Sequence, residues 1–173
     1  AGISHARGDY VALLDGDDVW GPHWISRALA FARKNPHSVL HPQIAVKFPL
    51  DLPECQQSPD SLDPAFDLSR LLIENAWVSL SLASRTIFTQ FPYPSSEDHR
   101  EFGYEDWAWN CDTAASGIRH RIVPKTAYFI RKRPVSQSAE SSAAGALPIR
   151  HLLTPERIRA LKPPDEQLAT DDL

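Results

Sequence analysis

A short apolar strand that runs directly into a cluster of acids constrains this chain more than any other feature. Residues 10–14 form an unbroken apolar run, which is typical of a strand buried on both faces in a parallel sheet. Asp15, Gly16, Asp17 and Asp18 follow at once, and the glycine permits a tight turn. Open α/β sheets place ligands at the carboxyl ends of their strands, and carboxylates suit a hard divalent cation. The position of the turn therefore predicts a cation site, although the same four residues in isolation would more often form a solvated turn.

A second acidic pair, Glu105 and Asp106, lies about half the chain later. It begins a stretch over 105–116 that predicts a helix, with Gly117 as the residue that ends it. Acids are also favoured in the first helical turn for purely structural reasons, so the pair alone is a weak signal. A cation site combined with a carboxylate that accepts a proton makes a group-transfer enzyme the leading interpretation.

The rest of the chain predicts alternating helices and strands. From residue 134 the sequence is rich in Ser, Ala and Gly, and a short helix over 154–161 is expected, with Thr154 as cap and Pro155 in its first turn. The remaining expected elements are helices over 22–35 and 67–74, strands over 38–40, 44–48, 78–83, 119–123 and 127–131, and loops over 49–64 and 92–100.

Composition restricts the class of protein. A chain of 173 residues with 42% hydrophobic and 23% charged residues predicts one soluble globular domain, and a net charge of −4 gives no reason to expect nucleic-acid binding. No apolar run is long enough to span a membrane, and no signal peptide is visible. Cys55 and Cys111 predict reduced thiols, buried or half-buried, of a cytoplasmic protein.

The segment 119–133 contains several basic residues and no acidic residue. It is therefore either a charged strand edge or a phosphate clamp.

Three segments in this order resemble family 2 glycosyltransferases of the GT-A fold. Residues 2–20 resemble the helix and strand that lead into the family's DXD motif, and residues 104–109 resemble its "ED" helix. Residues 128–138 resemble the aromatic, arginine and serine segment that follows. The resemblance covers residues 2 to about 138 and implies an α/β fold: a partial, Rossmann-like GT-A domain with a mixed sheet and flanking helices.

The resemblance implies an inverting transfer of a sugar from a nucleotide-sugar donor to a carbohydrate or glycolipid hydroxyl. Mg²⁺ or Mn²⁺ would be held by Asp17 or Asp18 and would neutralise charge on the leaving diphosphate, with Asp15 nearer the ribose. Asp106 would act as the general base, and Glu105 would orient the acceptor or the base.

The same resemblance assigns roles to two pairs of residues beyond the carboxylates. Arg131 and Arg133 would contact the diphosphate, because a guanidinium group matches phosphate oxygens. Trp107 and Trp109 would stack on the acceptor sugar, although core packing is an equally good account of one of them. Ala108 departs from the family pattern, which has an acid at that position.

In the family, the strands that bind the nucleotide precede the part that this chain resembles. The chain also contains no methionine, so we expect those strands to lie before residue 1. The expected organisation is a partial GT-A domain over 1–138 for the metal and acceptor sides, followed by a flexible segment over 139–173. The apolar strand over 10–14 would then be covered either by the missing strands or by self-association, and any membrane contact would be peripheral, through the longer protein.

Two other classes remain open from the sequence. A nucleotidyltransferase on a related scaffold would need a glycine-rich phosphate loop, and none is present. A truncated or degenerate transferase domain could instead serve as a non-catalytic binding module.

Overall fold

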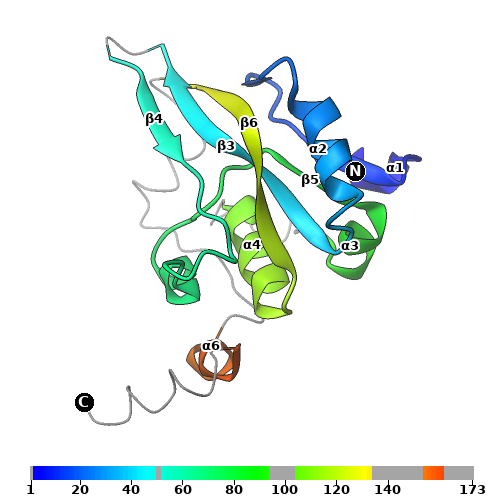
Figure 1. Ribbon diagram of the computed structural model, residues 1–173, viewed down its shortest axis with the longest axis vertical. Helices are drawn as coiled ribbons and strands as arrows, with labels where there is room; N and C mark the ends of the chain where they lie inside the picture. The colour runs from blue at the N-terminus through cyan, green and yellow to red at the C-terminus, as the bar shows by residue number, and fades with distance from the viewer. Residues whose placement is uncertain (1, 50–51, 94–103, 134–153, 162–173) are drawn as a thin grey trace.

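One mixed sheet organises the parts of the chain that the computed structural model describes, residues 2–49, 52–93, 104–133 and 154–161 (Figure 1). Five of its strands follow the order β1-β5-β3-β6-β2, and β4 pairs with β3 beside this path. The strands are β1 (Tyr10–Leu13), β2 (Val19–Trp20), β3 (Ser38–Phe48), β4 (Glu54–Gln57), β5 (Ser81–Ser84) and β6 (Arg119–Arg131). The helices are α1 (Gly2–His5), α2 (Trp24–Ala32), the 3₁₀ helix η1 (Leu68–Leu72), α3 (Arg85–Gln90), α4 (Glu105–Ala115) and α6 (Pro155–Leu161).

The long parallel pair of β3 and β6 forms the centre of the sheet. The sequence predicted two short strands in place of each, because prolines interrupt both patterns. The ladder instead continues through an irregularity between Pro42 and Ile44. There the Gln43 side chain accepts a hydrogen bond from the Lys125 N–H at 2.7 Å, and the Gln43 N–H donates to Thr126 Oγ1 at 3.1 Å. These side-chain contacts replace the missing ladder bonds, so each strand runs past its proline.

The pairing of β1 corrects one expectation. Its neighbour in the described chain is β5, and the two strands are antiparallel, with Tyr10 opposite Ser84. Only Val11 is buried, at 9% exposure, while the other three residues of β1 are half-buried. The expectation of parallel neighbours assumed that an apolar run marks a strand buried on both faces. Half-buried strands can also be apolar throughout, so the run did not determine the direction of the neighbouring strand.

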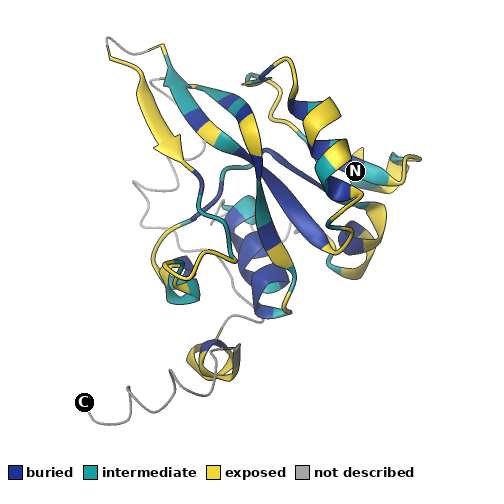
Figure 2. Cartoon of the chain, in the orientation of Figure 1, coloured by how far each residue is buried: buried dark blue, intermediate teal, exposed yellow. Residues whose placement is uncertain are grey.

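Helices pack on both faces of the sheet. Because successive strand residues point to opposite faces, Leu40 and Leu82 lie on one face and Val39 and Ala83 on the other. The first pair packs in one apolar cluster with Trp24, Ala28 and Ala32 of α2. The second pair packs in another cluster with Ile87 and Phe88 of α3 and Trp109 of α4. Figure 2 shows α4 as largely buried, with the strands crossing in front of it.

Several local predictions need correction. The expected loop over 49–64 contains β4, an exposed strand that pairs with β3 and carries the exposed Cys55. The sequence did not predict α3, which begins where the Ser84 hydroxyl accepts a hydrogen bond from the Ile87 N–H at 3.4 Å. The first long helix covers Trp24–Ala32 rather than 22–35, and the helix over 67–74 is a 3₁₀ helix. None of the helices in the described part of the chain has the length and apolar character needed to cross a membrane.

Candidate active site

The acidic turn after β1 is closed by its own backbone. The Asp18 N–H donates to the Asp15 carbonyl oxygen at 3.1 Å, so the chain reverses within four residues before β2 begins. The Asp15 carboxylate accepts a hydrogen bond from the Ser79 hydroxyl at 2.7 Å. The predicted turn is therefore present, and one of its carboxylates is held by a residue far away in the sequence.

The end of β6 holds the other two acids of the turn. The Asp18 carboxylate accepts hydrogen bonds from the Tyr128 hydroxyl and, at 2.7 Å, from the Arg131 N–H. The Arg131 side chain donates to the Asp17 carbonyl oxygen at 3.0 Å, and Arg133 forms an ion pair with the Asp17 carboxylate at 3.2 Å. The basic end of the segment 119–133 thus lies against the acidic turn, where it would also meet a bound phosphate.

The electrostatics of Asp18 reflect two opposing effects. Burial raises the pKa of Asp18, and the neighbouring carboxylates of Asp15 and Asp17 raise it further. The hydrogen bonds from Tyr128 and from the Arg131 N–H oppose this by stabilising the charged form. A carboxylate in such surroundings gains from a nearby positive charge, whether from an arginine or from a cation.

Asp106 lies in the first turn of α4 and is held at both carboxylate oxygens. One oxygen accepts from the Asn75 amide at 2.9 Å, and the other accepts from the Trp107 N–H at 2.8 Å. Burial raises the pKa of Asp106 to about 6, with smaller contributions from the charges of Glu105 and Asp15. Asn75, which contacts Asp106, is four residues from Ser79, which contacts Asp15, so one short segment touches both the start of α4 and the acidic turn. A half-buried carboxylate with a pKa near 6 has the properties of a general base at neutral pH.

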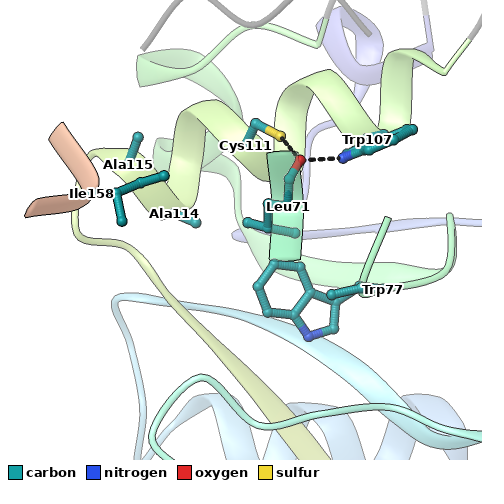
Figure 3. Packing of buried hydrophobic residues seen from close by; sticks show 8 residues of the cluster. Leu71, Trp77, Trp107, Cys111, Ala114, Ala115 and Ile158 are labelled. Atoms are coloured by element: carbon teal, nitrogen blue, oxygen red, sulfur yellow. Dashed lines mark hydrogen bonds between the residues drawn. The ribbon is translucent and has the colours of Figure 1, made fainter. Parts of the chain in front are cut away.

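Both tryptophans of α4 lie in the core. Trp107 is 7% exposed and donates its ring N–H to the Leu71 carbonyl oxygen at 2.9 Å, a contact drawn in Figure 3. Trp109 is 2% exposed, donates to the Phe91 carbonyl oxygen at 2.8 Å and stacks on Phe88. Core packing therefore accounts for both rings here, and neither presents an open face for a sugar.

The donor set of the acidic turn fits a cation that is only partly held by protein. Among the described residues there is no group of three or more His, Cys, Asp or Glu side chains arranged around one ion position. Mg²⁺ is usually bound by one or two carboxylates, with waters and substrate phosphates as its other ligands. Asp17 and Asp18 supply two such carboxylates beside arginines that suit a diphosphate, so the residues present match that type of site.

Three participating residues were missed by the sequence interpretation. Ser79, Tyr128 and Asn75 contact the predicted acids, but each is 31 or more positions away from its acidic partner. For these three residues the one signal in the sequence was that Tyr128, three positions before Arg131, lies in the third segment of the resemblance. The rest of that segment, residues 134–138, lies outside the described residues.

Comparisons with known proteins bear on the family and the fold of this chain. The family model described as "Glycosyl transferase family 2" matches residues 1–76. No curated protein matches the chain in sequence. Three crystal structures of S. aureus TarS have a similar fold. TarS 1–349 with UDP-GlcNAc has a TM-score of 0.55 at 19% identity and covers 79% of this chain. TarS 1–349 with UDP has a TM-score of 0.52 at 18% identity and covers 76%. A further TarS structure has a TM-score of 0.54 at 18% identity and also covers 76%.

The match extends over only part of those proteins. The chain spans 38% of each TarS 1–349 structure and 23% of the further TarS structure. At these identities the likeness shows the fold, which is that of part of a GT-A domain. Over residues 1–76 the chain is thus similar to glycosyl transferase family 2, and its fold is similar to that of the TarS structures.

Proposed function

We propose that this chain supplies the cation and acceptor sides of an inverting glycosyltransferase. The substrate pair would be a nucleotide-sugar and an acceptor hydroxyl of a carbohydrate or glycolipid. The observation that carries the proposal is the half-buried Asp106, whose pKa is raised to about 6. It is bonded to Asn75, four residues before the Ser79 that is bonded to Asp15 of the acidic turn. A TarS structure of the same fold was determined with UDP-GlcNAc, so a UDP-sugar is the first donor to test. The part involved would be the predicted domain over 1–138.

The acidic turn and the end of β6 would bind the diphosphate of the donor. Asp17 and Asp18 would hold Mg²⁺ or Mn²⁺, which when bound neutralises negative charge on the diphosphate. Arg131 and Arg133 already lie within 3.2 Å of Asp17 atoms, so their guanidinium groups would reach phosphate oxygens at the same place. Asp15 would lie nearer the ribose.

Asp106 would remove the proton of the acceptor hydroxyl as that oxygen attacks the anomeric carbon. The bond from that carbon to the diphosphate breaks on the opposite side, so the configuration inverts in a single displacement. Because two of the lone pairs of the carboxylate are used by Asn75 and the Trp107 N–H, others remain to accept the proton. Glu105, the preceding residue, would help to orient the acceptor.

The substitution Asp106→Asn tests this role in the native polypeptide. It keeps the shape of the side chain and removes its basicity, so transfer should fall by about 100-fold or more. Binding of the UDP-sugar, measured by calorimetry, should stay within about threefold of the wild-type value because the donor is held elsewhere. Asp112→Asn, the same change in the same helix, is the matched control and should retain transfer. A loss of less than tenfold in Asp106→Asn would reduce Asp106 to a structural acid of the first helical turn.

A further inference from the structure

The segment between η1 and β5 contacts both acidic sites. Asn75 donates to the Asp106 carboxylate at 2.9 Å, and four residues later Ser79 donates to the Asp15 carboxylate at 2.7 Å. Both side chains are half-buried, and no helix or strand is formed between them. A short stretch of irregular chain is thus bonded at one end to the candidate base and at the other end to the acidic turn.

The direction of the Asn75 amide is fixed by its neighbours. A carboxylate only accepts hydrogen bonds, so Asn75 must present its NH₂ group to Asp106. The side-chain oxygen of Asn75, Oδ1, then faces Asn110, whose side-chain NH₂ donates to it at 3.1 Å. Asn110 is 2% exposed and lies one helical turn after Asp106 in α4. The chain of amides therefore has a single orientation, and it prevents the Asp106 carboxylate from turning.

The contact at the other end is also shared. Besides its bond to Asp15, the Ser79 hydroxyl oxygen lies 3.1 Å from the Tyr128 hydroxyl, which in turn bonds to Asp18. Ser79 thus joins the acids at the two ends of the turn through one continuous set of contacts. Movement of Ser79 would alter the surroundings of both.

Trp77 anchors the segment between these two contacts. It is 2% exposed, its ring N–H donates to the Pro59 carbonyl oxygen at 2.8 Å, and its ring stacks on His120 with centroids 4.0 Å apart. Figure 3 shows its ring beside Leu71 in the core. Because the middle of the segment is held by the core, Asn75 and Ser79 cannot shift independently of the sheet and α4.

We propose that Asn75 and Ser79 are positioning residues, and that the segment from Asn75 to Ser79 sets the separation between Asp106 and Asp15. The proposal rests on the function proposed above, because the separation matters only if the two acids act on one substrate pair. In that reaction the acceptor oxygen and the diphosphate lie on opposite sides of the anomeric carbon. A change in the separation of the acids would misplace one of them relative to that carbon.

The two contacts should have opposite effects on the ionisation of Asp106. Asn75 donates to the charged carboxylate, so its removal should raise the pKa of Asp106. Ser79 holds Asp15 in place, and the Asp15 charge raises the pKa of Asp106. Freeing Asp15 should therefore lower that pKa. Among the described residues, the charge of the neighbouring Glu105 also raises this pKa, and neither substitution touches it. The Tyr93 phenol interacts with Asp106 as well, but it stays neutral because burial raises its pKa.

The experiment is an NMR titration of the Asp106 carboxyl carbon in the full 173-residue chain. Relative to wild type, Asn75→Ala should raise the pKa of Asp106 by about one unit, and Ser79→Ala should lower it by a few tenths. Asn75→Asp keeps the shape, cannot donate while ionised and adds a negative charge, so it should raise the pKa further. General loosening of the site would admit water and lower the pKa in every variant, so a rise in Asn75→Ala is not explained by a structural defect.

Two matched controls remove equivalent contacts elsewhere. Ser69→Ala deletes another bond from a serine hydroxyl to an aspartate, Asp67, and Asn35→Ala deletes another hydrogen-bonded amide. Neither should shift the pKa of Asp106. An unchanged or lower pKa in Asn75→Ala and Asn75→Asp would overturn the positioning role of Asn75. An unchanged pKa in Ser79→Ala would overturn the claim that the segment sets the separation.

The outcome is separable from that of the proposed function. The titration needs no substrate, so it decides the positioning whether or not the protein transfers a sugar. In the native polypeptide, Asn75→Ala should then lower kcat by about tenfold with little change in the donor KM, whereas Ser79→Ala should mainly raise the donor KM. If Asp106→Asn retains transfer while the titration behaves as expected, the function is wrong and the geometric role stands.

Discussion

At the scale of single residues, the site contains carboxylates in two different environments. Asp106 is half-buried, and its pKa is raised to about 6 mainly by loss of solvent. Asp17 carries an ion pair with Arg133, and Asp18 takes two hydrogen bonds from the end of β6. Different environments allow one carboxylate to accept and release a proton while other carboxylates stay charged beside a cation.

The pH dependence of transfer should follow Asp106. Because its pKa is raised to about 6, the carboxyl is protonated below that pH and can no longer accept the acceptor proton. The value of kcat/KM should therefore fall by about tenfold per pH unit below pH 6 and level off above about pH 7. The measurement is a pH–rate profile in the native polypeptide, with circular dichroism at each pH to monitor the fold. A profile that is flat from about pH 5 to pH 8 would contradict the assignment.

Cation binding should depend on the acidic turn. Replacing both Asp17 and Asp18 by Ala removes the carboxylates that lie beside the two arginines, so Mn²⁺ should lose its site. Titration with Mn²⁺, followed by water proton relaxation, should show binding to the wild-type chain and no binding to the double variant. Asp67→Ala, which removes a carboxylate at the start of η1, should bind as wild type does. Equal binding by the double variant would mean that the turn is only a solvated turn.

At the scale of elements, the site depends on where helices and strands end. The carboxyl end of β1 carries the acidic turn, the end of β6 supplies the residues that hold it, and the first turn of α4 supplies Asp106. The other end of α4 is fixed by α6, whose Ile158 is 5% exposed and packs with Ala114 and Ala115 in the cluster of Figure 3. Arg157 adds a hydrogen bond to the Ala115 carbonyl oxygen at 2.7 Å.

Removing the apolar anchor of α6 should release this helix alone. Seven residues are too few for a helix to persist without packing, so Ile158→Ala should melt α6 while the sheet remains folded. Hydrogen exchange at the amides of α6 should become about tenfold faster or more, with the amides of β3 and β6 unchanged. Ala160→Ser, at an exposed position of the same helix, should leave exchange unaffected. Loss of protection throughout the chain would show that α6 is part of the central core.

At the scale of the whole molecule, two buried histidines join the sheet to α4. The Thr113 hydroxyl donates to the Trp109 carbonyl oxygen at 2.7 Å, so it must accept from His120 Nε2 at 3.0 Å. His120 Nδ1 is then the acceptor for His41 Nε2 at 2.9 Å. Both rings are 0% exposed, and burial lowers the pKa of His41 to about 3 and that of His120 well below its usual value. The two rings are thus neutral in the folded chain.

Acid should therefore destabilise the whole fold. In the unfolded chain the histidines bind protons as the pH falls through about 6.5, whereas in the folded chain they do not. The contribution of the two neutral histidines to the free energy of unfolding is fully present above that pH. It decreases as the pH falls towards 3, by about 1.4 kcal/mol per pH unit for each histidine. In His120→Gln the amide can still donate and accept but does not titrate, so the slope of unfolding free energy against pH should decrease by about that amount. Denaturant unfolding between about pH 6 and pH 4 measures it. His37→Gln, at an exposed position, should keep the wild-type slope, and an equal slope in both variants would contradict the argument.

The sequence by itself determined the local features of this protein. The apolar run before Asp15, the acids at the start of α4 and Gly117 at its end with φ of 81° all depend on neighbours along the chain. Periodicity and turn chemistry report such features directly. The same local patterns, compared with a known family, were sufficient to predict the partial GT-A fold and the family whose model matches residues 1–76.

Only the tertiary structure decided which distant residues meet. The pairing of β1 with β5, the strand β4 within an apparent loop, the burial of Trp109 and the contacts of Asn75 and Ser79 all join parts of the chain that are far apart or depend on packing. An asparagine or serine in an irregular segment has the same sequence signature whether it faces water or a carboxylate. Its role is set by what the fold places opposite it, because a hydrogen bond depends on distance and direction in space and not on separation along the chain.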